Sequence, residues 1–69
     1  MRLSARNQLQ GTVSDIRRGE AIANVAVDVA GQRLVASITV EAVEELGLSE
    51  GARVTAIIKA SDVILATPE

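Results

Sequence analysis

The sequence predicts a small all-β domain with one short helix, and three observations support that prediction. The chain has 69 residues, a length that allows only one domain. Apolar and polar residues alternate with a period of two along several short stretches, as they do on half-buried strands. One stretch between two of these has the residue spacing and the boundary residues of a helix. We therefore expect a single domain over residues 1–69.

The first predicted strand covers residues 8–16. Apolar residues share one face along most of it, but Ile16 breaks the alternation. Such a break predicts a β-bulge near Ser14 or Asp15, because one extra residue reverses the side on which the following residues point. A connecting turn is expected over residues 17–20.

A pair of strands is predicted next, joined by a tight turn. Residues 21–30 place three valines on one face and polar or small residues on the other. Gly31 and Gln32 form the expected turn, and residues 33–38 form the partner strand with the same alternation.

A helix is predicted between Thr39 and Gly47. Thr39 has a hydroxyl side chain favoured at an N-cap, and glycine is the residue most often found just beyond a helix C-terminus. Glu41 falls in the first turn, where the helix dipole favours an acid. Residues spaced by three provide one apolar stripe: Val40, Val43 and Leu46.

Two further strands are predicted after the helix. Residues 53–59 alternate again, residues 60–62 interrupt the pattern, and residues 63–66 make a last short strand. Five short strands with one helix between the third and the fourth are typical of the OB-type barrel. The predicted fold class is therefore all-β, a five-stranded OB-like small barrel.

The small size and the composition predict an oligomer. A chain of this length buries only about 60% of its unfolded surface by itself. With no cysteine and no histidine, disulfides and the usual zinc, copper or iron sites cannot add stability, which leaves oligomerisation. We expect surplus apolar faces to lie against other subunits, with an alanine-rich surface as the alternative. The surplus positions are Ala21, Ala23, Ala26, Val35 and Ile57.

Missing residue types exclude several classes of function. Without cysteine or histidine the chain lacks a thiol nucleophile and an imidazole base, so we expect no enzyme. Without aromatic residues and with a net charge of −2, it is poorly suited to bind nucleic acid. It has no apolar stretch of about 18 residues and no signal pattern, so we expect no membrane partner and a cytoplasmic location.

Three polar segments are candidates for binding, and each has a plain structural alternative. Residues 4–11 are dense in hydrogen-bond donors, but they also fit a solvated N-terminus. Thr39 starts the helix, whose free N–H groups suit a small anion, although its hydroxyl could simply cap the helix. Lys59, the only lysine, precedes Ala60 and Ser61 where a strand breaks, and it also fits a solvated strand end.

Segments along the whole chain resemble the molbindin family, also called Mop proteins, which are small molybdate-binding proteins of the TOBE, OB-like type. The resemblance covers essentially all 69 residues and leaves no extra domain. Its most specific parts are the opening hexamer and the segment around the lysine. The similar segments are Ser4-Ala5-Arg6-Asn7-Gln8-Leu9 with Gly11 and Val13, residues 35–39, residues 43–48, Gly51, and residues 56–63.

The resemblance implies a homohexamer built as a trimer of dimers, with dimers that exchange their N-terminal strand. It also implies that molybdate or tungstate binds at subunit interfaces, with no cofactor and no metal except molybdenum in its oxyanion. The family often has a hydroxyl residue where this chain has Ala42, which leaves one ligand hydrogen bond unaccounted for. The implied oxyanion-binding residues are Ser4, Arg6 through its backbone N–H, Thr39, Lys59 from a neighbouring subunit, the Ala60 amide and, as a weaker candidate, Ser61.

The chemistry of a tetrahedral dianion fits this set of residues. Four acceptor oxygens need convergent neutral donors and one or two cations, since charge-assisted hydrogen bonds are about twice as strong as neutral ones. No single strand holds all the donors, so the site must be assembled across segments and, we expect, across chains. The predicted function is cytoplasmic binding and storage or homeostasis of molybdate or tungstate. The alternatives are an OB-type nucleic-acid-binding module and a structural oligomerisation domain with a decayed anion site.

Overall fold

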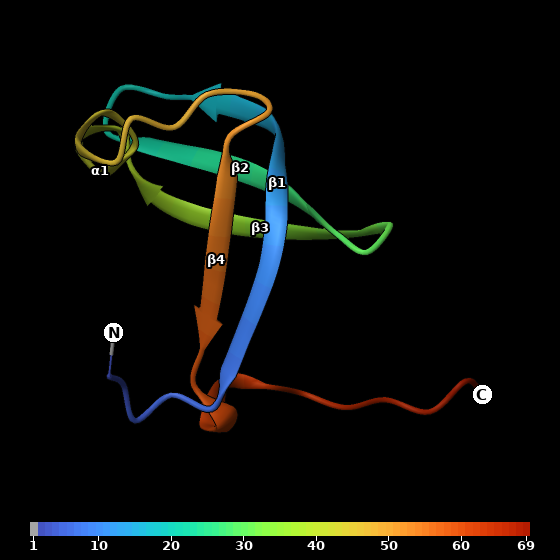
Figure 1. Cartoon of the computed structure of the whole chain (residues 1–69). Helices are drawn as coiled ribbons and strands as arrows, with labels where there is room; N and C mark the ends of the chain where they lie inside the picture. Colours follow the sequence, from blue (N-terminus) through green and yellow to red (C-terminus); the bar gives the residue numbers. More distant parts are fainter. Residues whose placement is uncertain (1) are drawn as a thin grey trace.

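Four antiparallel strands form one sheet in the order β3-β2-β1-β4, in a computed structural model that describes residues 2–69 (Figure 1). The predicted all-β class with one short helix is confirmed for this part of the chain. The elements are β1 (Asn7–Arg18), β2 (Ile22–Val29), β3 (Gln32–Thr39), α1 (Val40–Glu45), β4 (Arg53–Ile58) and the 3-10 turn η1 (Ala60–Asp62).

Strand β1 is the axis of the sheet because it pairs with β4 along its first half and with β2 along its second half. The pairing register shifts between Val13 and Asp15, which confirms the predicted bulge. The Ser14 hydroxyl, at the bulge, donates to the Ala26 carbonyl at 3.2 Å. The strand bends strongly, so the β2–β3 hairpin crosses the β1–β4 pair (Figure 1).

The turn between β2 and β3 is one residue earlier than predicted. Val29 pairs with Gln32, so Ala30 and Gly31 are the two central residues. Both have positive φ, +50° for Ala30 and +85° for Gly31. This is the requirement of a type I′ turn, whose twist matches that of the flanking strands. Glycine meets it without strain, whereas alanine does not.

Helix α1 starts and ends where the sequence predicts. The Thr39 Oγ1 accepts a hydrogen bond from the Ala42 N–H at 3.0 Å, which is the expected N-cap. Gly47 has a φ of +63° just after the C-cap residue Leu46. The apolar stripe is shorter than predicted, because Val43 is buried while Leu46 is exposed at the end of the helix.

The core lies between the bent sheet and α1, and small β-branched residues fill it. Five buried residues form one cluster, and partly buried neighbours from β3, β4 and the loop before β4 pack against them. Two of the surplus apolar positions are buried within this chain, Ala23 in the core and Ala26 on the opposite face of β2. The cluster comprises Val13, Ala23, Val25, Val27 and Val43.

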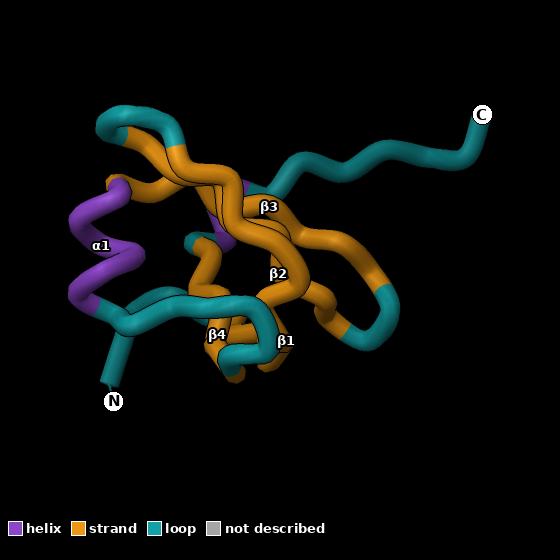
Figure 2. Tube along the Cα trace, turned by 90° about the horizontal axis from the view of Figure 1, so that it is seen from above, coloured by secondary structure: helices purple, strands orange, loops and turns teal. Residues whose placement is uncertain are grey.

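The predicted fifth strand is absent, so the sheet is not a closed barrel within residues 2–69. Residues 63–66 pair with no strand, and β3 and β4 each keep one free edge. Physically, the turn η1 directs the chain out of the sheet after β4. Figures 1 and 2 both show the C-terminal segment running away from the body of the protein.

The predicted exchange of the N-terminal strand is not seen either. Strand β1 pairs with β2 and β4 of its own chain from Asn7 to Arg18. Its many backbone hydrogen bonds and the burial of Val13 therefore stabilise this chain itself.

Candidate functional site

The six predicted oxyanion-binding residues lie at opposite ends of β1. Thr39 ends β3 and pairs with Ile22, next to the last residues of β1. The other five belong to the two segments that meet where Asn7 pairs with Ile58, and we call them the turn-end residues: Ser4, Arg6, Lys59, Ala60 and Ser61. At about 3.3 Å per residue, the strand between the two ends is far longer than one hydrogen-bonded site. One chain therefore does not bring all six together.

The two cationic residues at the turn end adjoin residues that pair with each other in the sheet. Asn7, the first residue of β1, pairs with Ile58, the last residue of β4. Arg6 directly precedes the former and Lys59 directly follows the latter. The pairing of Asn7 with Ile58 therefore brings Arg6, in the predicted N-terminal motif, close to the lysine segment.

The donors at the turn end are uncommitted. The side chains of Ser4, Arg6, Lys59 and Ser61 are exposed, and none makes a hydrogen bond within residues 2–69. Turn η1 uses the N–H of Asp62, which donates to the Lys59 carbonyl at 2.9 Å, and that of Val63. The N–H groups of Ala60 and Ser61 are left without a partner in this part of the chain, as the first N–H groups of a helical turn usually are.

The helix end is different because its donors already serve the fold. The Val40 N–H donates to the Ala21 carbonyl at 2.8 Å, and the Ala42 N–H donates to Thr39. The expectation of a set of free N–H groups at the start of α1 is therefore wrong for these two groups, and the capping alternative for Thr39 is confirmed. The Thr39 hydroxyl uses only a lone pair in its cap, so its hydrogen can still be donated to a ligand.

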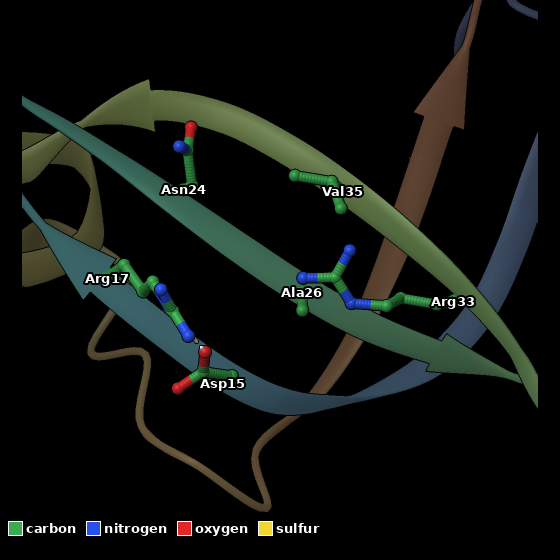
Figure 3. Close-up of a pocket in the computed structure, with 6 residues that line it drawn as sticks. All are labelled: Asp15, Arg17, Asn24, Ala26, Arg33 and Val35. Atoms are coloured by element: carbon green, nitrogen blue, oxygen red, sulfur yellow. Dashed lines mark hydrogen bonds and ion pairs between the residues drawn. The ribbon is translucent and has the colours of Figure 1, made fainter.

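A polar hollow on the outer face of the sheet contains none of the predicted residues (Figure 3). It has a volume of ≈ 410 Å³ and is lined by Asp15, Arg17, Asn24, Ala26, Arg33 and Val35. The Arg17 Nε lies 3.3 Å from Asp15 Oδ2, and the arginine side chain is 84% exposed. Figure 3 shows Arg33 reaching from β3 towards Ala26 on β2.

This hollow was not predicted, although the period-two alternation does place its residues on one face. Its lining makes it a poor anion site, because the negative charge of Asp15 offsets the charge of one of the two arginines. Exposed ion pairs of this kind contribute little energy. The turn end is therefore the stronger candidate.

Neither a metal centre nor a membrane span is found in the described part of the chain. No group of three or more acidic, histidine or cysteine side chains is placed to hold a metal ion among residues 2–69. No helix in the same range is both long and apolar enough to cross a bilayer.

The structure is a small, open, OB-like domain with polar donor groups at both ends of β1. The TOBE domain family matches residues 3–65, so the chain belongs to the TOBE domain family. Among its relatives, molybdenum-pterin-binding protein 1 of Clostridium pasteurianum is 46% identical over 66 residues, covering 94% of this chain and 97% of the relative. Molybdenum-pterin-binding protein 2 of the same organism is 44% identical over the same length.

Two solved structures have the same fold. A molybdate-binding protein from Sporomusa ovata is 39% identical, with a TM-score of 0.92 over 97% of this chain and 100% of that chain. ModG, described as a cytoplasmic molybdate-binding protein, is 49% identical in a form with molybdate bound. Its TM-score is 0.93 over 99% of this chain, which spans 49% of the ModG chain. These likenesses confirm the resemblance drawn from the sequence.

Proposed function

We propose that this chain is a single molybdate-binding domain, residues 1–69, that holds molybdate or tungstate between subunits of a homo-oligomer. The observation that supports this most strongly is the set of uncommitted donors at the turn end, on the scaffold of a relative with molybdate bound. Its role is cytoplasmic storage or homeostasis of the oxyanion. It is not an enzyme, because holding an inert oxyanion requires no nucleophile and no proton transfer.

The turn-end residues supply the chemistry that a tetrahedral dianion requires. Lys59 and the N–H groups of Ala60 and Ser61 offer donors to one side of the anion, and Ser4 and the Arg6 N–H offer donors from the neighbouring segment. Each hydrogen bond to a charged oxygen contributes about 1.5–3 kcal/mol when water is excluded. Exposed as they are in one chain, these donors gain that strength only when another subunit covers them.

The Thr39 hydroxyl completes the proposed site from a different subunit. It lies at the far end of β1 from Lys59, so the two meet around one anion only if two chains approach each other. We propose that the assembly is a homohexamer, a trimer of dimers. A ligand that binds only the assembled form stabilises it by mass action. Exchange of the N-terminal strand is not part of this proposal, because β1 pairs within its own chain.

Isothermal titration calorimetry with molybdate, tungstate and sulfate tests the proposal, with light scattering in parallel to measure the oligomeric state. We expect saturable binding of molybdate or tungstate to an oligomer, and weaker binding of sulfate, which is smaller. No heat with any of the three anions would overturn the proposed function.

A negative titration would separate the two alternatives to oxyanion binding. An oligomer that binds none of the anions would be the structural oligomerisation domain with a decayed site. Tight binding of an oligonucleotide in a gel shift at low salt would instead support a nucleic-acid-binding module. We expect no such shift, given the net charge of −2 and the absence of aromatic residues.

A further inference from the structure

The polar hollow on the outer face of the sheet is built from three neighbouring strands. Its central row runs straight across them, because Ala26 of β2 pairs with Asp15 of β1 and with Val35 of β3. Arg17 and Asn24, which also pair, stand next to this row. At ≈ 410 Å³, the hollow has the volume of a small-molecule site, which is about 300–1,000 Å³. Because paired strands fix these positions, the lining presents a defined set of groups to a ligand.

Arg33 does not pair with the acid that stands opposite it. It is in register with Asp28 of β2, yet its guanidinium makes no ion pair or hydrogen bond within the described chain. Figure 3 shows its side chain extended along the sheet towards Ala26 instead. Ala26 is only 3% exposed, although it lines the hollow. A flat, unpaired guanidinium beside a small apolar floor is a surface on which a planar ring stacks.

The opposite wall of the hollow places acceptors and donors side by side. Arg17 Nε donates to Asp15 Oδ2 at 3.3 Å. A carboxylate has about four lone-pair sites, so Asp15 can accept further hydrogen bonds. The terminal N–H groups of Arg17 and the amide of Asn24 supply donors next to it. A carboxylate flanked by donors matches a ring edge on which N–H donors stand beside a carbonyl.

The charges of the lining favour a small ligand with one negative group. Two arginines and one aspartate give the hollow a charge of +1, in a chain whose net charge is −2. A simple anion would gain little here, because exposed ion pairs contribute little energy. A polyphosphate strand is disfavoured as well, because Asp15 and Asp28 interrupt the arginines along this face. A flat ring with a single charged group fits better than either.

We propose that the hollow binds a free purine nucleotide of the guanine kind. The ring stacks on the Arg33 guanidinium and contacts Val35, which is 48% exposed. The ring N–H and the exocyclic amino group donate to Asp15, and the ring carbonyl accepts from Arg17 or Asn24. Stacking combined with hydrogen bonds to this edge is how proteins read a single base. The site does not depend on the proposed oxyanion binding, because none of the residues proposed for that role lines the hollow.

An NMR titration of the intact, isotope-labelled protein tests the proposal, with no oxyanion added. The probes are guanosine monophosphate, adenosine monophosphate and ribose phosphate. We expect saturable chemical-shift changes confined to the hollow with guanosine monophosphate. Adenosine monophosphate should bind about tenfold more weakly, because adenine has one amino donor on this edge and loses a hydrogen bond to the carboxylate. Ribose phosphate, which has no ring to stack, should cause no saturable change.

Three variants assign the roles within the hollow. Arg33→Gln removes the stacking surface and is expected to weaken binding of guanosine monophosphate about tenfold. Arg53→Gln is the matched control, because Arg53 lies in the same row across the sheet as Arg33 but outside the hollow, and it should bind as the natural chain does. Asp15→Ala removes the acceptor and should abolish the preference for guanine over adenine.

Several results would overturn the proposal. Equal binding of all three probes would show that the arginines attract phosphate alone. Shift changes around Lys59 in place of the hollow would show that the nucleotide occupies the turn end through its phosphate. No saturable change with any probe, or natural binding in Arg33→Gln, would show that the hollow holds no ring.

Discussion

The two ends of β1 use the same kinds of polar groups in opposite ways. At the helix end, Thr39 Oγ1 and the N–H groups of Val40 and Ala42 are hydrogen-bonded within the chain, and they fix where α1 begins. At the turn end, the Lys59 side chain and the N–H groups of Ala60 and Ser61 have no hydrogen-bond partner in the described chain. The donors at one end therefore contribute to folding, whereas those at the other end are free, and we propose that they bind the ligand.

This difference fits the proposal that a chain of 69 residues binds its anion between subunits and not in a cavity of its own. A single small domain cannot exclude water from its own surface, so the exclusion has to come from another subunit. Single substitutions can separate the part of the molecule that maintains the fold from the part that we propose binds the ligand.

The largest effect is expected from Gly11→Ala, which would disrupt both ends at once. A Cβ at Gly11 would lie 2.6 Å from the Asp28 carbonyl oxygen and 2.6 Å from Val27 Cγ1. Because β1 connects β2 to β4 at this point, we expect the free energy of unfolding to fall by about 3 kcal/mol. Urea denaturation measures it. A loss below about 0.5 kcal/mol would show that β1 can move away from β2 here, contrary to the central role given to this strand.

Lys59→Ala tests the turn end and is expected to weaken molybdate binding by about 1.5–3 kcal/mol with no loss of stability. The Lys59 side chain makes no hydrogen bond in the described chain, and the substitution keeps the backbone carbonyl that accepts from Asp62, so the fold should not be affected. Calorimetry and urea denaturation give the two numbers. Arg33→Ala, in the outer hollow, is the control and should bind as the natural chain does. Natural affinity in Lys59→Ala would refute the site assignment.

Thr39 should affect both properties, because its hydroxyl caps the helix and is proposed to bind the anion. Thr39→Ala is expected to lower the free energy of unfolding by about 1 kcal/mol and also to weaken binding. Thr39→Asp keeps a cap acceptor but loses the donor, so it should retain stability and lose binding. If Thr39→Asp bound molybdate normally, Thr39 would have only its structural role.

The smallest effect is expected from Ala30→Asn, at the tip of the β2–β3 hairpin and distant from both sets of donors. Ala30 has a φ of +50°, a conformation that asparagine adopts more readily than alanine. We expect a gain of about 0.5–1 kcal/mol in unfolding free energy and unchanged binding. Thermal and urea unfolding measure the gain. A lower stability would mean that the turn is not held in the type I′ conformation.

The elements that depend on local patterns could be predicted from the sequence. Alternation located the strands, the break at Ile16 indicated the bulge, and Thr39 and Gly47 marked the ends of the helix. The hairpin turn was misplaced by one residue because Ala30, not glycine alone, adopts a positive φ. The local sequence does not indicate this positive φ, because the neighbouring glycine is sufficient to predict a turn.

The features that depend on a second chain could not be predicted in the same way. Residues 63–66 have the composition of a strand, but whether a strand forms depends on which edge is available to it. Likewise, the uncommitted state of Lys59 and Ser61 becomes visible only when every hydrogen bond around them is located. The resemblance implied a set of binding residues, and the structure places that set at two ends of β1.

Complementation between two weak-binding variants tests most directly whether one site is built from two chains. Thr39→Ala and Lys59→Ala are unfolded and refolded together in equal amounts, and molybdate binding is measured by calorimetry. If Thr39 of one chain and Lys59 of another share an anion, random mixing restores an intact pair at about a quarter of the sites, with natural affinity. A mixture that binds no better than the average of the two variants would contradict the shared site.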